Sequence, residues 1–288
     1  MSRVKSVARV LNGHPTTDGA GVRIYRAIGD SDIKLTDPFL MLDDIHSSNP
    51  DDYMAGFPLH PHRGMETVTY MISGAMNHQD SLGNKGRIGS GDVQWMTAGS
   101  GILHQETPER HVGFMQGFQL WVNLPRKNKM MDPRYRGIRN EDIPTVSPEN
   151  GVIVKVVAGK FEGVVGPVMD LVQPVEFLDV ELGPMKHFRH EVDPAWNCFA
   201  YVFRGDGEFG ADDAVSVETG QVAVFDKGDE VESIGGDKGI RFILAAGKPL
   251  SEPVAWGGPV VMNTQEEVDL AFRELRSGTF VKTKPKTY

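Results

Sequence analysis

The two halves of this 288-residue chain repeat one pattern of short apolar runs and glycine turns, and this repeat constrains the fold most. In the first half, HRGMETVTYMISGAMNH is followed by IGSGDVQWMTAGSGILH and then FQLWVNLP. In the second half, HFRHEVDPAWNCFAYVFRGDGEFG is followed by VETGQVAVFDKGDEVESI and then RFILAAGKP. Gly74 matches Gly205 and Pro125 matches Pro249, at offsets of 131 and 124 residues. Because self-similarity at a nearly fixed period marks repeated structural units, we infer two copies of one β-domain fused in tandem.

The apolar runs are rich in β-branched and aromatic residues and are bounded by Gly, Asn and Asp, which predicts strands. The strands expected in the first half are 21–27, 39–44, 66–73, 76–80, 92–97, 101–106 and 117–123. Those expected in the second half are 152–159, 175–182, 198–205, 208–209, 221–225, 231–234 and 239–246. One helix is expected near the C-terminus, where Asn263 or Thr264 can cap the first turn and Gly278 ends the last.

Composition indicates a soluble protein of ordinary character, with 40% hydrophobic and 24% charged residues. A net charge of −9 argues against direct binding to nucleic acid or to a membrane surface. The only cysteine, Cys198, excludes an intramolecular disulfide and fits a reducing compartment. No apolar stretch follows the first charged residues, and no run reaches the length of a membrane span. We therefore expect a cytoplasmic protein, with the nucleus as the alternative in a eukaryotic cell.

The histidines point to a metal site in the first half of the chain, which holds seven of the nine. His60-Pro-His62 is followed, 42 residues later, by His104-Gln-Glu106. In a strand, side chains two positions apart lie on the same face, so each pair can point at one place. Two such strands side by side offer three imidazoles and one carboxylate. Imidazole suits Zn, Cu, Fe and Ni, and a set of histidines with a carboxylate and open positions suits non-haem Fe(II).

The second half lacks this ligand pattern. His187 and His190 lie near the corresponding position, but Arg189 stands where the second histidine is needed and His190 has the other strand parity. No histidine occurs in the later stretch 231–234. We therefore expect the second copy to be structural and without a metal.

The histidine pairs lie in segments that resemble the two motifs of the cupin superfamily of small β-barrels. The first motif corresponds to Gly56, His60, His62, Glu66 and Gly74, in that order. The second motif corresponds to Gly91, Thr97, Gly99 and His104, with Thr97 in place of the usual proline. The resemblance makes Glu66 a rival to Glu106 as the carboxylate ligand, because cupins commonly use the glutamate that follows the first two histidines.

More specifically, the chain resembles the pirin family over essentially its whole length. The segments that carry the resemblance are DPFLMLDD, FPLHPHRGMETVTYMISG, GDVQWMTAGSGILHQE, FQLWVNLP and MNTQEEVDLAFRELRSGTF. The resemblance implies an all-β bicupin, with residues 1–130 as an N-terminal metal-binding barrel. Residues 131–288 would form a degenerate C-terminal barrel followed by a short helix.

The pirin resemblance also implies one metal per chain, held by His60, His62, His104 and Glu106. Iron as Fe(II) is the expected ion, with Cu, Mn, Ni, Co or Zn as alternatives. Glu66 then becomes a residue that orients a ligand imidazole. Arg63, beside the ligands, would either contact an anionic substrate or form an ordinary ion pair.

The activity implied by the resemblance is quercetin 2,3-dioxygenase, the oxidative opening of a flavonol ring, with Glu106 as the catalytic base. The alternative is a non-enzymatic, metal-dependent protein-binding regulator, either a transcriptional cofactor or a partner of a metabolic enzyme. We expect a monomer whose partner is a small aromatic substrate or, under the alternative, another protein.

Overall fold

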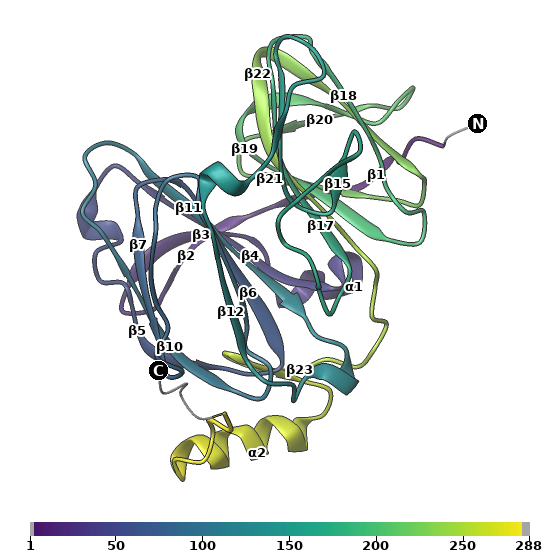
Figure 1. The fold of residues 1–288 in the computed structure, drawn as a ribbon. Coiled ribbons are helices and arrows are strands. Elements are labelled where there is room, and N and C mark those ends of the chain that lie inside the picture. Colours follow the sequence, from purple (N-terminus) through teal and green to yellow (C-terminus); the bar gives the residue numbers. More distant parts are fainter. Residues whose placement is uncertain (1–2, 284–288) are drawn as a thin grey trace. The chain divides into compact units, whose positions relative to one another are not determined.

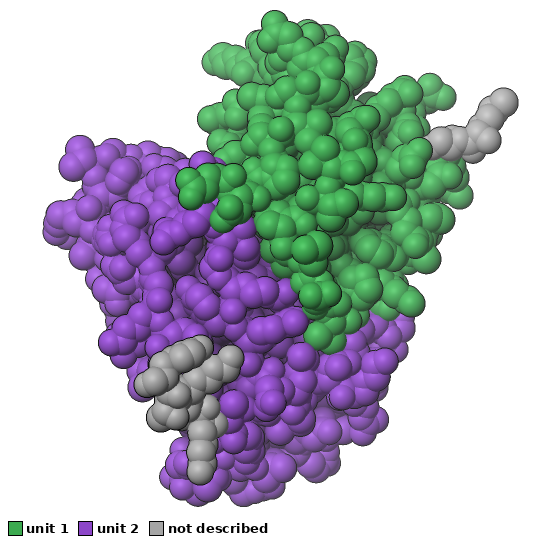
Figure 2. Space-filling model, viewed as in Figure 1, with its two compact units in different colours: residues 1–14, 27–40, 141–249 green, residues 15–26, 41–140, 250–288 purple. Residues whose placement is uncertain are grey.

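The computed structural model describes residues 3–283, which fold as two compact units built from interleaved stretches of chain (Figures 1 and 2). Within that described range, unit 1 draws on residues 1–14, 27–40 and 141–249. Unit 2 draws on residues 15–26, 41–140 and 250–288, again within the described range. The strands of each unit pair antiparallel.

Unit 1 contains one large sheet that starts with the first strand of the chain. Its strand order is β1 (Val7–Asn12), β21 (Gln221–Phe225), β19 (Asn197–Phe209), β22 (Glu230–Gly247), β17 (Val175–Leu182), β14 (Val152–Ala158) and β13 (Thr145–Val146). β18 (His187–Glu191) pairs with β22, and β20 (Val215–Glu218) pairs with β19. A small separate ribbon consists of β15 (Lys160–Phe161) and β16 (Val164–Val165), and the helix α1 spans Ile33–Thr36. Cys198 is buried in the apolar core of this unit.

Unit 2 contains two sheets. The larger has the order β12 (Arg134–Ile138), β9 (Val93–Thr97), β6 (Met65–Ser73), β11 (Met115–Asn123), β4 (Phe39–Ser47), β3 (Val22–Ile28) and β2 (His14–Asp18). The smaller has the order β5 (Phe57–His62), β10 (Ile102–Pro108), β7 (Met76–Asp80) and β8 (Lys85–Ile88). A hairpin of β23 (Ala255–Gly257) and β24 (Val260–Met262) precedes α2 (Gln265–Arg276), which lies below β23 in Figure 1. Short 3₁₀ turns span Asp30–Asp32, Pro50–Asp52, Arg126–Asn128 and Asn140–Asp142.

The all-β prediction with one C-terminal helix is confirmed. The strands β7, β17 and β21 have the bounds expected from sequence. The helix α2 begins with a capping box, in which Thr264 accepts from the Glu267 backbone N–H and the Glu267 carboxylate accepts from Thr264. Two expected strand breaks do not occur, because β19 and β22 continue through the irregular pairing between Gly205 and Gly207.

The compact units differ from the two continuous domains expected, residues 1–130 and 131–288. β1 pairs with β21, with Val10 opposite Ala223, so the first strand of the chain completes unit 1. α2 packs on β23 and β24 and belongs to unit 2, with its buried side chains Val268 and Ala271 in a cluster with Val260. No pattern in the sequence marks β1 as part of unit 1 or α2 as part of unit 2, because a local pattern does not encode long-range pairing.

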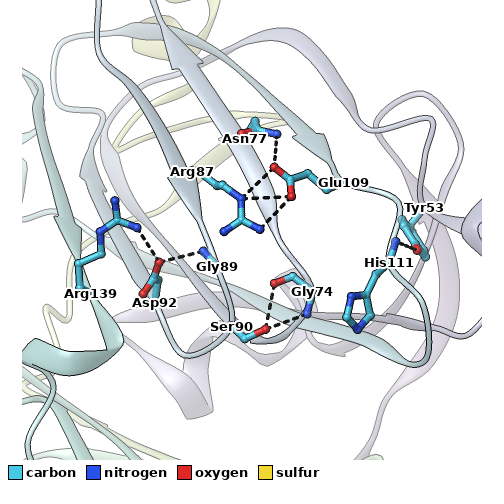
Figure 3. Close-up of polar contacts among 10 residues, drawn as sticks. All are labelled: Tyr53, Gly74, Asn77, Arg87, Gly89, Ser90, Asp92, Glu109, His111 and Arg139. Atoms are coloured by element: carbon cyan, nitrogen blue, oxygen red, sulfur yellow. Dashed lines mark hydrogen bonds and ion pairs between the residues drawn. The ribbon is translucent and has the colours of Figure 1, made fainter.

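Charged side chains tie together the connections of the smaller sheet in unit 2 (Figure 3). The Arg87 Nη2 atom in β8 lies 2.9 Å from Glu109 Oε2, just after β10, and Asn77 Nδ2 in β7 donates to Glu109 Oε1 at 3.0 Å. Asp92 accepts from the Gly89 backbone N–H and from Arg139, as Figure 3 also shows. Glu109 thus ties the end of β10 to β7 and β8, and β10 is the strand that carries His104 and Glu106.

Candidate metal centre

The paired strands β5 and β10 bring the two histidine motifs together. They run antiparallel, with His60 opposite His104 and His62 opposite Ile102. The register shifts before His60, so Phe57 lies opposite Glu106. β5 therefore has one extra residue there, a bulge of the kind that re-aims side chains. The expectation that the two motifs lie side by side on neighbouring strands is correct.

Three imidazoles converge at this place. The ligand atoms of His60, His62 and His104 all lie within 4.8 Å of one another. His60 Nδ1 must donate to the carbonyl oxygen of Pro58, 2.9 Å away, because a carbonyl can only accept. The His60 Nε2 atom is therefore an unprotonated acceptor, and it lies 3.0 Å from His62 Nε2.

The same residues pass a chemical test for a metal. His104 Nε2 is buried and has no hydrogen-bond partner among the described residues. Burial lowers the pKa of His104 well below its usual range, and the neighbouring histidines, led by His62, lower it further. Burial, followed by the charge of His60, likewise lowers the pKa of His62. Neutral imidazoles with convergent lone pairs are the form that binds a divalent cation.

Glu106 lies in a second group that shares His104. The ligand atoms of His78, His104 and Glu106 are also within 4.8 Å of one another, and all three residues are buried. The structure thus brings the four expected ligands into one region, but as two overlapping triads rather than one. His78 belongs to β7, where it lies opposite Glu106 on the neighbouring strand β10.

Glu106 is oriented from the opposite sheet. Its Oε1 atom accepts from Thr69 Oγ1 at 3.0 Å, and its Oε2 atom accepts from Gln119 Nε2 at 2.8 Å. Thr69 and Gln119 are direct neighbours on β6 and β11. Trp121 Nε1 donates to Gln119 Oε1 at 3.0 Å, which fixes the orientation of that amide. Sequence analysis missed Thr69, Gln119 and His78, since none of them lies within a recognisable ligand spacing.

The role expected for Glu66 is wrong. Its carboxylate accepts from Trp95 Nε1 at 3.0 Å and from Thr97 Oγ1 at 2.5 Å, and Arg136 lies 3.6 Å away. Glu66 and Thr69 have opposite parity on β6, so Glu66 faces away from Glu106. A turn separates Glu66 from His62, because β5 ends at His62 and β6 starts at Met65, so the spacing of the two residues in the sequence does not set the direction of Glu66.

Arg63 is a structural residue, the second of the two roles considered for it. Its side chain is 2% exposed and pairs with Glu274 of α2 at 2.8 Å. It also donates to the Phe280 carbonyl oxygen at 2.9 Å and lies over the Phe280 ring. The guanidinium is thus used to dock the C-terminal segment onto the turn that follows His62.

A cavity of about 510 Å³ lies against His60 and His62. Its walls are mostly apolar and include Ile24, Met41, Ile45, Phe57, Trp121 and Trp256. The rings of Trp121 and Trp256 lie 5.7 Å apart, and the Trp121 ring meets the His62 ring edge-on at 5.2 Å. Arg26 and Asp43, which form an ion pair at 2.8 Å, supply charge to the same lining. The size and character suit a compact aromatic ligand.

In the second half of the chain, His190 and Arg189 pair with carboxylates. His190 Nε2 lies 2.8 Å from Glu176, and Arg189 pairs with Glu232 at 2.9 Å. The interior of unit 1 is filled by apolar side chains, among them Phe188 and Phe242. Both groups with metal-binding geometry in the part of the chain that the structure describes belong to unit 2.

Comparison with known proteins gives one consistent result. The pirin family profile matches residues 21–122, and the profile of the pirin C-terminal cupin domain matches residues 177–281. Human pirin is 39% identical over 100% of this chain and 98% of its own length. A Pseudomonas aeruginosa protein, provisionally named a quercetin 2,3-dioxygenase, is 43% identical over 96% of this chain and 99% of its own.

Solved structures agree with the sequence comparisons. A quercetin 2,3-dioxygenase from Acinetobacter baumannii superposes with a TM-score of 0.89 at 32% identity, over 96% of this chain and 98% of that one. A bacterial pirin from Escherichia coli, solved with nickel(II), has a TM-score of 0.65 at 21% identity, over 84% of this chain and 99% of its own, a likeness of fold alone. None of the described helices is long and apolar enough to span a membrane. The profile matches and the full-length relatives together show that this chain belongs to the pirin family.

Proposed function

We propose that this chain is a metal-dependent dioxygenase that opens the central ring of flavonols such as quercetin. The observation that carries the proposal is the convergence of three imidazoles, two buried and one half-buried, at the wall of a mostly apolar cavity. The names of the Pseudomonas and Acinetobacter relatives support the same reaction. A cytoplasmic monomer acting on a small aromatic substrate remains the expectation.

His60, His62, His104 and Glu106 are the residues proposed to hold one divalent metal. Three imidazole nitrogens and one carboxylate oxygen form a donor set that suits Fe(II), the ion we propose, although Cu, Mn, Ni, Co and Zn accept similar donors. When bound, such an ion supplies Lewis acidity, which lowers the pKa of a hydroxyl group placed against it.

The chain's own residues would bind the flavonol and take its proton. Trp121, Trp256 and Phe57 offer flat apolar surfaces for the rings. Glu106 is the proposed base for the 3-hydroxyl proton, and Thr69 and Gln119 hold its carboxylate in place while lone pairs remain to accept that proton. In the overall reaction dioxygen is consumed, the central ring opens and carbon monoxide leaves.

The test is metal content and quercetin loss, measured on the same preparations of wild type, His60→Ala and His187→Ala. We expect wild type and His187→Ala to carry one metal per chain and to consume quercetin with dioxygen, whereas His60→Ala loses both. His187 is the matched control because it is an exposed histidine on β18 of the other unit. A metal-loaded wild type without flavonol turnover would overturn the dioxygenase and favour the metal-dependent regulator.

A further inference from the structure

We propose that His78 and Asp80 are positioning residues that hold the proton of His104 on Nδ1 and so present His104 Nε2 to the metal. This inference rests on the proposed metal centre, but it concerns residues outside the ligand set. No ligand spacing in the sequence marks either residue. The side chains of His78 and Asp80 are both 0% exposed, so solvent cannot replace the contacts between them.

Asp80 has four hydrogen-bond donors around its two carboxylate oxygens. Oδ1 accepts from the backbone N–H groups of Leu82 and Asn84, at 2.9 and 3.0 Å. Oδ2 accepts from Asn84 Nδ2 at 2.8 Å and lies 3.3 Å from His78 Nε2. A carboxylate can only accept, so the proton of this contact must be on His78 Nε2.

The proton on His78 Nε2 determines the next contact. A neutral imidazole carries one proton, so His78 Nδ1 is left as an acceptor. It lies 3.4 Å from His104 Nδ1, at the long end of hydrogen-bond distance. The proposed metal would lie between the facing nitrogens of His60 and His62, but no cation is proposed between His78 Nδ1 and His104 Nδ1. Two bare lone pairs would repel there, so His104 Nδ1 carries the proton. His104 Nε2 is then unprotonated, and this is the buried atom that has no partner among the described residues.

The competing role for His78 is that of a metal ligand, because its ligand atom lies within 4.8 Å of those of His104 and Glu106. Both of its nitrogens are already engaged, however, one with Asp80 and one with His104. His60 Nε2, by contrast, has only the facing nitrogen of His62. A buried partner that fixes the tautomer of a ligand histidine is a common feature of metal sites.

Asp80→Asn is the decisive variant, because it keeps the shape of the side chain. The two backbone N–H groups cannot reverse, so they hold the amide oxygen of the variant at the Oδ1 position. The new amide N–H₂ then faces both Asn84 and His78 Nε2. The Asn84 side chain can turn its amide oxygen towards it, and His78 Nε2 must become an acceptor. His78 now carries its proton on Nδ1, and His104 can avoid a clash only by moving its own proton to Nε2, which blocks the metal.

Two substitutions at His78 separate positioning from packing. His78→Leu removes the acceptor that faces His104, whereas His78→Asn places an amide oxygen close to the same point. His190→Asn serves as the control, since His190 is a buried, carboxylate-paired histidine in unit 1. Circular dichroism and thermal melting of the metal-free proteins establish that each variant is folded.

The readout is the dissociation constant for Co(II), measured on the full chain by competition with a chromophoric chelator. We expect Asp80→Asn and His78→Leu to bind Co(II) about 10- to 100-fold more weakly, the usual effect of losing such a partner. His78→Asn and His190→Asn should stay close to wild type. Unchanged binding in folded Asp80→Asn would overturn the inference, and so would unchanged binding in folded His78→Leu.

Proton NMR of the Co(II)-loaded protein distinguishes the two roles of His78. We expect the wild type to show shifted, exchangeable N–H signals from His60, His62 and His104 only. A further imidazole signal that disappears in His78→Asn would make His78 a ligand and overturn the positioning role. Failure of the wild type to bind Co(II) or Fe(II) would instead sink the proposed metal centre and this inference with it. Metal binding without quercetin loss would sink only the dioxygenase.

Discussion

The surroundings of the buried Glu106 carboxylate suit both roles proposed for it, metal ligand and base. Thr69 and Gln119 each occupy one of its oxygens from the opposite sheet, and Trp121 holds Gln119 in turn. These neutral donors fix the direction of the carboxylate without adding a positive charge that would compete with a cation. The arrangement leaves a second lone pair on each oxygen for the metal or for a substrate proton.

Glu106→Gln should therefore slow quercetin turnover by about 100-fold or more, the usual contribution of a general base. The hydroxyl of Thr69 can rotate to accept from the new amide, so we expect the fold to survive. Glu66→Gln is the matched control, because Glu66 is equally buried but faces the other side of β6. Full metal content with full turnover in Glu106→Gln would remove its role as base.

Lys129 is a buried cation beside the turn that follows His62. Its Nζ donates to the carbonyl oxygens of Gly64 and Val261 and to Asn123 Oδ1, at 2.8, 2.9 and 2.6 Å. Burial is the largest influence on this group and lowers its pKa from 10.5 to about 7. Burial disfavours the charged, protonated form of Lys129, whereas the three hydrogen-bond acceptors stabilise that form.

This balance predicts a pH-dependent stability. Between about pH 7 and 10.5 the unfolded chain binds a proton at Lys129 that the folded chain does not, so the free energy of unfolding rises with pH. Lys129→Met lacks this contribution, and the advantage of wild type over the variant should grow across that window. Urea denaturation near both ends of the window measures it. An advantage that shrinks as the pH rises would mean that the three acceptors raise the pKa instead.

Among the elements, the turn between β5 and β6 connects the proposed metal site with the β23–β24 hairpin of unit 2. Gly64 has a φ of +82°, and a side chain there would collide with the carbonyl oxygen of Val261. The turn is bonded to the β23–β24 hairpin, since Val261 N–H donates to the Arg63 carbonyl oxygen at 3.0 Å. The position of His62 is therefore set partly by residues near the C-terminus.

Gly64→Ala should destabilise the protein far more than Gly83→Ala and should also weaken Co(II) binding. Gly83 has a similar φ of +89°, but nothing lies within 4 Å of the space that a side chain would fill. We expect Gly83→Ala to cost about 1–2 kcal/mol, the strain of a left-handed residue alone. Urea denaturation and a Co(II) titration of both variants check this. Equal losses in the two would show that backbone strain, not the Val261 contact, sets the effect.

The sequence was enough to predict which side chains point the same way when those residues lie within one strand. The parity of His60 with His62, and of His104 with Glu106, survives in β5 and β10 because each pair lies within a single strand. The role expected for Glu66 was wrong because a turn separates it from His62. His78 was missed because its position opposite Glu106 depends on the register of two strands. The same limit explains why β1 and α2 were assigned to the other unit. Which elements pair or pack together depends on contacts between residues that are far apart in the sequence.

For the molecule as a whole, metal binding should stabilise unit 2 selectively. A ligand that binds only the folded state at 100 times its dissociation constant adds about 2.7 kcal/mol of stability. Amides of β5, β10 and the β23–β24 hairpin should then exchange about 100-fold more slowly with solvent, where exchange requires unit 2 to open. Those of β19 and β22 in unit 1 should change much less.

Hydrogen exchange of the full chain with and without Co(II), followed by mass spectrometry, makes this comparison. His60→Ala, which should show no change in either unit, is the control. Slower exchange in β19 and β22 equal to that in β5 would mean that the two units open as one. An unchanged exchange rate in the β23–β24 hairpin would mean that its contacts with the turn between β5 and β6 contribute little stability.

The interleaving of the two units also has a consequence during synthesis. A ribosome releases the histidine-bearing strands early, whereas Arg63 must wait for Phe280, 217 positions later, to find its partner. Trp256 and Pro259, which line the cavity, emerge in the same late stretch. In the interval the imidazoles lack one wall of their cavity. A nascent chain therefore meets the ions of the cell before its pocket is finished, and the proposed metal site would be open to whichever divalent ions are then present.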